Sequence, residues 1–149
     1  MKYRHYRMMT MDETLNDEGL QAHGSHVFVD CLGYVSPFPS DGTWILQMMQ
    51  EAVRLSEVRE VHSHVVEFDG SVSPPGFAAM VLIDESHVSA HCYSDRGWLA
   101  LDSFTCGGTD ADGIMDNLLN SIISKIPTLR IVRRDKVDRF LHEDQQDKA

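Results

Sequence analysis

The chain has 149 residues, of which 42% are hydrophobic and 24% charged, as in an ordinary globular protein. This length suffices for one domain with a substantial core. The formal net charge of −10 argues against a nucleic-acid partner, because phosphate binding needs basic surface. No apolar run reaches the length of a membrane span, and the three cysteines form no disulfide framework. We therefore expect a cytoplasmic protein without a membrane partner.

The two ends of the chain are its least patterned parts. Residues 1–23 are basic at first and then acidic, and no apolar stretch follows Arg7. This segment predicts a flexible arm rather than a signal peptide. Residues 135–149 follow a basic cluster and become acidic, which is typical of a solvated tail. A single domain is expected over residues 24–134.

The first half of this domain predicts a strand, a helix and a second strand. Alternation of apolar and polar residues favours strands at residues 26–35 and 60–68, and turn-forming residues predict loops at 36–42 and 69–76. Between the two strands, residues 43–56 carry a broad apolar stripe at helical spacing, which consists of Ile45, Met48, Met49, Ala52, Val53 and Leu55.

The middle of the chain predicts neighbouring strands. Apolar alternation runs through residues 79–83, returns in residues 88–90 and resumes in residues 98–101. A turn is expected at residues 94–97, because Ser, Asp and Gly cluster there. These segments would lie side by side in one antiparallel sheet.

A second helix and a last strand complete the predicted domain. Thr109 or Asp110 is a suitable N-cap for a helix that runs to about Lys125, where Pro127 prevents its continuation. Residues 128–132 then predict a strand. The expected fold class is α+β, a two-layer sandwich of one antiparallel sheet with two helices on one face.

Three potentially reactive side chains lie within the central strands. Ser86 directly follows Glu85, His91 comes five residues after the serine, and Cys106 comes twenty residues after it. On adjacent strands joined by a bend, a nucleophile, a base and a thiol acid would come within reach of one another. The sequence therefore predicts a catalytic site formed by Ser86, His91 and Cys106.

The same residues resemble a known protein family. The segment from Glu85 to His91, followed by residues 102–107, is similar to the prokaryotic S-adenosylmethionine decarboxylase family, which has the same intervals from serine to histidine and from serine to cysteine. The Pro-Pro-Gly sequence at residues 74–76 matches the family's Pro-x-Gly turn, and the family order of elements extends over residues 24–134. The resemblance implies the same α+β fold and a homodimer of processed chains.

The resemblance also implies self-cleavage and a covalent cofactor. Family members are made as a proenzyme that cuts itself between a glutamate and a serine, here Glu85 and Ser86. Ser86 would become a pyruvoyl group, the cofactor, whose ketone forms a Schiff base with the substrate amine and accepts electrons as carbon dioxide leaves. His91 would be the base in the elimination that forms this group. Cys106 would return a proton to the substrate, in a reaction of polyamine biosynthesis.

The residues expected to bind the substrate depart from the family pattern. Family members hold the adenine of S-adenosylmethionine between a phenylalanine and a tryptophan, and an acidic residue binds the ribose. The corresponding positions here are Val72, Tyr93 and Asp95. Tyr93 can stack and Asp95 can accept hydrogen bonds, whereas Val72 cannot form an aromatic wall. A further departure is Ala78, where the family has a serine associated with processing.

These departures leave three functions open. The chain is an S-adenosylmethionine decarboxylase, or a pyruvoyl-dependent ornithine or arginine decarboxylase in which Glu67 or Asp69 pairs with a distal cation. The third function is that of an uncut, non-enzymatic relative that acts as a partner subunit, which Ala78 alone supports. No metal site is predicted, because no carboxylate or cysteine has suitable spacing near His62 and His64.

Overall fold

The computed structural model describes residues 19–143. These residues form six strands and two helices, in the order expected for an α+β protein. The elements are β1 (Leu20–Leu32), α1 (Asp41–Leu55), β2 (Glu60–Phe68), β3 (Gly76–Ile83), β4 (Ser86–Tyr93), β5 (Trp98–Cys106), α2 (Ala111–Lys125) and β6 (Arg130–Glu143).

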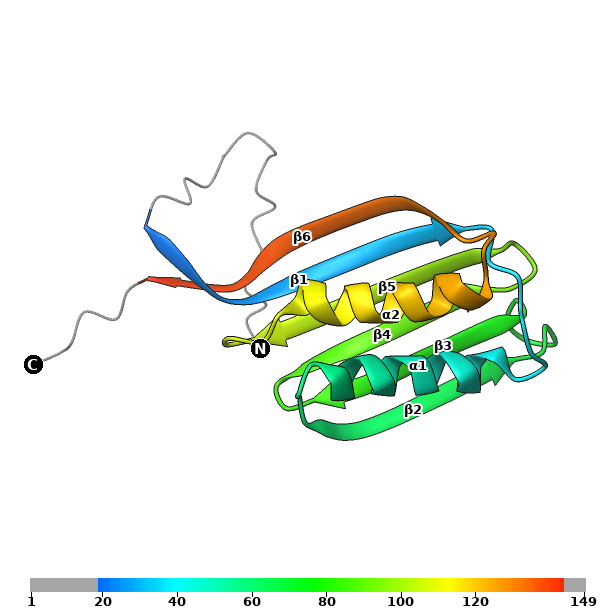
Figure 1. Ribbon diagram of the computed structural model, residues 1–149, viewed down its shortest axis with the longest axis horizontal. Coiled ribbons are helices and arrows are strands. Elements are labelled where there is room, and N and C mark those ends of the chain that lie inside the picture. The colour runs from blue at the N-terminus through cyan, green and yellow to red at the C-terminus, as the bar shows by residue number, and fades with distance from the viewer. Residues whose placement is uncertain (1–18, 144–149) are drawn as a thin grey trace, which may run out of the picture.

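The strands form one antiparallel sheet in the order β2-β3-β4-β5-β1-β6, and both helices cover the same face of it (Figure 1). Along the central strands every second side chain is buried beneath the helices, because successive side chains of a strand point to opposite faces. The predicted two-layer sandwich is confirmed. Its core contains, among others, Val27, Val29, Ile45, Met49, Phe77, Val81, Val88, Leu101, Ile114, Leu118 and Ile122.

Local sequence signals predict several element boundaries correctly. β2 matches the predicted strand at both ends, and α2 begins as expected after Asp110, whose side chain accepts a hydrogen bond from the backbone N–H of Asp112. α1 starts two residues before the predicted position, at Asp41. These segments have a clear apolar period or a polar N-cap, so their structure can be inferred locally.

Both terminal strands are longer than the sequence predicts. β1 starts at Leu20 and β6 continues to Glu143, so residues 20–23 and 135–143 do not belong to a flexible arm or a solvated tail. The rest of those two segments lies outside the described residues. The predicted ends of the domain were wrong because every residue of β6 is exposed, and its sequence therefore lacks the alternation of apolar and polar residues that indicates a strand. Backbone pairing with β1 forms this strand instead.

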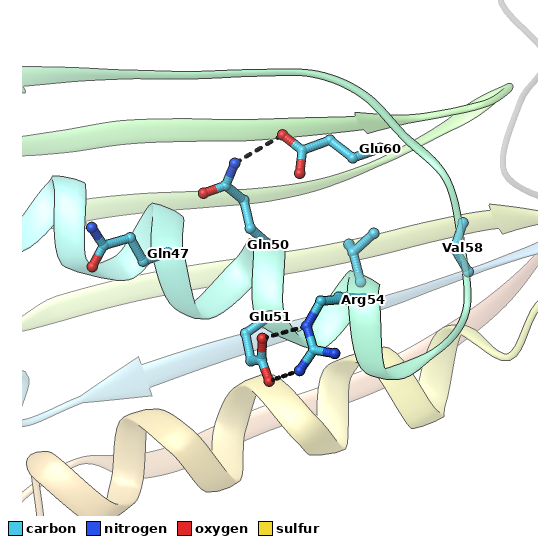
Figure 2. Close-up of a pocket in the computed structure, with 7 residues that line it drawn as sticks. Gln47, Gln50, Glu51, Arg54, Val58 and Glu60 are labelled. Carbon is cyan, nitrogen blue, oxygen red and sulfur yellow. Dashed lines mark hydrogen bonds and ion pairs between the residues drawn. The ribbon is translucent and has the colours of Figure 1, made fainter.

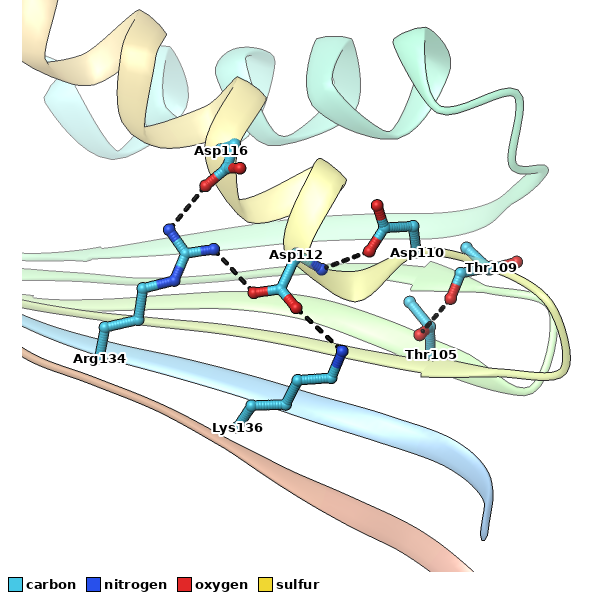
Figure 3. Close-up of polar contacts among 7 residues, drawn as sticks. All are labelled: Thr105, Thr109, Asp110, Asp112, Asp116, Arg134 and Lys136. Carbon is cyan, nitrogen blue, oxygen red and sulfur yellow. Dashed lines mark hydrogen bonds and ion pairs between the residues drawn. The ribbon is translucent and has the colours of Figure 1, made fainter.

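Side chains of α2 hold β6 against the helix layer (Figure 3). Asp112 accepts hydrogen bonds from Arg134 at 2.8 Å and from Lys136 at 2.9 Å, and Arg134 also donates to Asp116 at 2.6 Å. These cations hold the pKa of the Asp112 carboxyl below its usual range, first through Lys136 and then through Arg134. The exposed last strand is thereby attached to the N-terminal turn of α2.

The sheet face turned away from the helices remains open in this chain. We call it the open face; on β3, β4 and β5 its side chains include Met80, Leu82, His87, Ser89, His91, Tyr93, Trp98, Asp102, Phe104 and Cys106. Several of its apolar side chains, including Met80 and Trp98, stay exposed. Neither helix within residues 19–143 is long and apolar enough to cross a membrane.

Candidate active site

The Glu85–Ser86 peptide bond lies at a tight hairpin turn. Ile83 and Ser86 face each other across β3 and β4, so the turn consists of Asp84 and Glu85 alone. Asp84 adopts a left-handed backbone conformation, with φ of 39°, which costs a non-glycine residue of the order of 1 kcal/mol. The exposed Glu85 thus joins directly to the buried Ser86, the first residue of β4.

Cys106 lies beside this peptide bond. The β4–β5 register pairs His87 with Phe104, and its continuation brings Cys106 opposite Glu85. The Cys106 Sγ is 3.9 Å from the carbonyl oxygen of Glu85, toward which the thiol can donate. Cys106 is partly exposed, whereas burial raises the pKa of the Cys31 thiol to about 11 and that of Cys92 to about 12. Cys106 is therefore the accessible thiol of the three.

His91 does not join the other two predicted catalytic residues within the chain. Both Ser86 and His91 belong to β4, and at about 3.4 Å per residue they lie roughly 17 Å apart. Their spacing of five residues is odd, so the two side chains also point to opposite faces of the sheet. The expected cluster of three side chains therefore does not form within one chain. Cys106 lies beside the Glu85–Ser86 peptide bond on the open face, whereas the Ser86 side chain is buried on the helix side and His91 lies at the other end of β4.

A cavity of about 700 Å³, the Cys106 cavity, opens beside the hairpin turn. Glu85, Cys106 and Gly107 form one side of it. The other side comes from the two chain segments that the sequence predicted to be an arm and a tail, and it consists of His23, Phe140, Leu141 and His142. Composition and periodicity contain no signal for these residues.

A second cavity of about 370 Å³, the His91 cavity, lies at the other end of β4. His91 lines it together with its cross-strand neighbour Ala78, so the departure from the family pattern is adjacent to the histidine. A further hollow of about 290 Å³ adjoins His91 and Tyr93 and reaches Trp98. Arg96 lies over the Trp98 ring, 4.9 Å from its centroid.

The predicted substrate-binding residues differ in their surroundings. Tyr93 lines the His91 cavity, Asp95 is exposed in the adjoining turn, and the Val72 side chain is 97% exposed. Sequence reasoning missed Phe68, which also lines this cavity. Phe68 and Tyr93 flank Gly76, which pairs with both, and a Cβ on Gly76 would lie 1.9 Å from the carbonyl oxygen of Cys92. The signal available in the sequence was the position of Phe68, an aromatic residue at the end of the alternating strand β2.

A polar network crosses the open face between the two cavities. Asp102 accepts hydrogen bonds from His26 at 2.9 Å and from Ser89 at 3.2 Å. Arg139 lies 3.2 Å from the other ring nitrogen of His26 and can only donate, so the neutral His26 carries its proton on Nε2. Burial lowers the pKa of the nearby His87, with the His26 charge as a second cause.

The remaining polar hollow lies on the helix side, away from these residues (Figure 2). Its side chains pair with one another: Gln50 donates to Glu60 at 2.8 Å, and Arg54 pairs with Glu51. Within residues 19–143 no group of three or more His, Cys, Asp or Glu side chains is placed to hold a metal ion. The hairpin turn and the open face thus carry the candidate site.

Comparisons with known proteins identify the family of this chain. The family model described as S-adenosylmethionine decarboxylase matches residues 25–135. A protein named S-adenosylmethionine decarboxylase proenzyme from Brevibacillus brevis is 34% identical over 100 residues, which are 67% of this chain and 72% of that protein. One of the same name from Thermococcus onnurineus is 28% identical over 116 residues, covering 77% and 79%.

A solved structure has the same fold. The adenosylmethionine decarboxylase from Aquifex aeolicus superposes with a TM-score of 0.56 at 24% identity, covering 83% of this chain and 91% of that one. A protein named S-adenosylmethionine decarboxylase proenzyme 2 from Bacillus cereus is 31% identical over 67% of this chain and 78% of its own length. The family match spans most of the described residues. The chain belongs to the S-adenosylmethionine decarboxylase family.

Proposed function

We propose that the protein is an S-adenosylmethionine decarboxylase that is made as a proenzyme and cuts itself between Glu85 and Ser86. The observation that carries this proposal is the position of the Cys106 thiol, 3.9 Å from the carbonyl oxygen of Glu85. That oxygen gains negative charge when the peptide bond is attacked, and a neighbouring S–H donor stabilises such a charge. The strained Asp84 next to the bond further favours cleavage.

Self-cleavage consumes only groups of the protein and water. Ser86 Oγ adds to the carbonyl carbon of Glu85, the C–N bond breaks, and the hydroxyl proton passes to the departing nitrogen. Loss of the Cα proton of residue 86 and of the Glu85 carboxylate, followed by hydrolysis with release of ammonia, leaves a pyruvoyl group at residue 86. The residues fit this group, because Ser86 begins a strand behind an exposed turn and Cys106 lies beside it. The pyruvoyl ketone supplies the electron sink for loss of carbon dioxide.

The proposal includes a homodimer whose two chains share each site. Because His91 lies roughly 17 Å from Ser86 along β4, it cannot act on the same chain's Ser86. The open face of each chain carries exposed apolar side chains such as Met80 and Trp98, which a second sheet would cover. In a face-to-face pair the partner's His91 would serve as the base in the elimination, and Cys106 would return the proton to the substrate.

The His91 cavity is the proposed site for the adenine. Phe68 and Tyr93 stand on either side of Gly76, about two strand spacings or roughly 9.6 Å apart at their Cα atoms. A planar ring stacked between two aromatic rings needs a gap of this order. Phe68 would thus provide the wall that Val72 lacks, and Asp95 would accept hydrogen bonds from the ribose hydroxyls.

The alternative as an ornithine or arginine decarboxylase has less support. Glu67, a suggested partner for a distal cation, accepts hydrogen bonds from the backbone N–H and the hydroxyl of Thr43 at 3.0 and 3.4 Å. This carboxylate therefore serves the N-terminus of α1. Asp69 accepts a hydrogen bond from the backbone N–H of Ser71 at 2.8 Å. The uncut relative remains supported by Ala78 alone.

The decisive experiment is an intact-mass spectrum of the purified protein under denaturing conditions, followed by carbon dioxide release from carboxyl-labelled S-adenosylmethionine, ornithine and arginine. We expect two fragments that divide after Glu85, the second with a blocked N-terminus, and release from S-adenosylmethionine. Ser86→Ala should give one uncut chain, whereas the control Ser89→Ala should still cut. A single uncut wild-type mass would refute the proposal, and release from the amino acids only would establish the alternative substrate.

A further inference from the structure

The ends of β1 and β6 form a two-stranded ribbon that extends beyond the rest of the sheet (Figure 1). β5 ends where Cys106 pairs with Gly24, so residues 20–23 pair only with β6. We call residues 20–23 together with 140–143 the ribbon. It supplies His23, Phe140, Leu141 and His142 to the Cys106 cavity.

Several contacts fasten the ribbon beside Cys106. The backbone N–H of Gly107 donates to the carbonyl oxygen of His23 at 2.7 Å. The Phe140 ring packs on Phe104, with 5.6 Å between ring centroids, and fills the space over Gly24, where a Cβ would lie 3.5 Å from it. Arg139 lies over the Phe104 ring at 4.8 Å. The ribbon is thus attached directly to the residue that follows the thiol.

Phe140 also has an unusual backbone conformation. Its φ is 52°, in the left-handed region that a phenylalanine rarely adopts. The β1–β6 pairing skips this position, since Ala22 pairs with Leu141 and Gly24 with Arg139. Leu141 and His142, which follow this position, border the space in front of Cys106.

We propose that the ribbon is a wall of the active-site cavity, with Phe140 as the positioning residue that seats it over Cys106 and His142 as a group that contacts the substrate. This proposal rests on the proposed function for the identity of the substrate. The ribbon lies outside the segments in which the sequence predicted any site residue. It encloses the reacting end of the substrate, which carries the amine, beside residue 86.

His142 has the hydrogen-bonding pattern that an ammonium group requires. Its Nδ1 lies 2.9 Å from the carbonyl oxygen of Phe140, which can only accept, so Nδ1 carries the proton. In the neutral ring Nε2 is then an acceptor. A primary ammonium group in the Cys106 cavity can donate to this nitrogen, while Phe140 and Leu141 provide apolar contact.

The wall is tested by the rate at which iodoacetamide alkylates Cys106, located by peptide mapping. Measurements in a Ser86→Ala background keep every chain uncut, as in the structure. Phe140→Ala should raise the rate by up to about tenfold. The aromatic pair of Phe140 with Phe104 shifts the equilibrium between the attached and the detached ribbon by about that factor. Val137→Ala, on the same strand outside the cavity, should leave it unchanged. Phe140→Gly, which suits the positive φ, should keep the fold and raise the rate as well. Unchanged rates in both Phe140 variants would overturn the wall.

The substrate contact is tested by steady-state kinetics with S-adenosylmethionine. His142→Leu should raise KM by about tenfold with little change in kcat, and His142→Gln, which keeps an acceptor, should recover most of the loss. His62→Leu is the control on a distant strand. An unaltered KM in His142→Leu would overturn the contact. If the Phe140 variants speed the alkylation of Cys106 but the chain with Ser86 intact releases no carbon dioxide from S-adenosylmethionine, the wall stands and the proposed function fails.

Discussion

The two ends of β4 offer different halves of a catalytic site. At the Ser86 end a strained turn leads into a buried serine, and a thiol lies beside the peptide bond between them in a cavity that the chain's own ribbon lines. At the His91 end a histidine and aromatic side chains line two hollows on an open sheet. Each end lacks what the other provides. In the proposed homodimer, the Ser86 end of one chain and the His91 end of the other would form one site.

The strongest test of this division is complementation between two inactive variants. His91→Ala and Cys106→Ala should each lower decarboxylation at least about 100-fold, since each removes a proton-transfer group. Coexpressed in equal amounts, they should recover about one quarter of wild-type activity, because half of the dimers are mixed and each has one intact site. As a control, His62→Ala, which changes a histidine on β2, should be fully active. Absence of any recovery would mean that each site is complete within one chain.

The His91 end can be examined separately through Phe68. Phe68→Ala should raise KM for S-adenosylmethionine by up to about tenfold and leave kcat nearly unchanged, because an aromatic stacking contact contributes about 1 kcal/mol to binding. Self-cleavage, which belongs to the Ser86 end, should proceed at the wild-type rate in the intact-mass assay. Val66→Ala, two residues earlier on β2, is the matched control. Equal KM values in Phe68→Ala and wild type would remove Phe68 from the site.

The ion pairs that attach β6 to α2 predict a smaller effect, which concerns stability. Asp112→Asn should lower the free energy of unfolding by at most about 1 kcal/mol, because the ion pairs with Arg134 and Lys136 are partly exposed. The folded pKa of Asp112 is depressed, so this contribution is present above the unfolded pKa and is lost as pH falls through the folded value. Urea titrations at pH 7 and pH 3, with Arg134→Gln in a double-mutant cycle, measure it. A coupling energy of zero would contradict the attachment.

The smallest expected effect concerns His87, which follows Ser86 in β4 and lies on the open face. Its folded pKa is lowered by burial and then by the His26 charge, so the folded chain binds this proton more weakly than the unfolded chain does. The neutral His87 ring therefore contributes fully to the free energy of unfolding above the pKa of the unfolded chain, near 6.5. This contribution declines as the pH falls below that value. Urea midpoints at pH 7.5 and 5.5 should show this decline, and His87→Gln should reduce it. An identical decline in His87→Gln would assign the effect to other groups.

Local sequence signals predicted most of the fold. The apolar period of residues 43–56 and the N-cap Asp110 identify helices because both signals arise within a few residues of the chain. β6 could not be found in this way, because its exposed residues show no alternation and it depends on pairing with β1, about 110 residues away. For the same reason, no local pattern in the sequence indicated that His142 and Phe140 line a cavity.

The sequence by itself determined the α+β class, the family and the position of Cys106 beside the Glu85–Ser86 peptide bond, because a short hairpin and regular pairing convert residue spacing directly into position. Spacing along one strand also separated His91 from Ser86, since five residues give an odd parity and roughly 17 Å. Only the tertiary structure decided which distant segments meet. Backbone pairing of β1 with β6 placed the ribbon at Cys106, and Gly76 brought Phe68 and Tyr93 to opposite sides of one cavity. These contacts join residues far apart in the chain, so no local pattern encodes them.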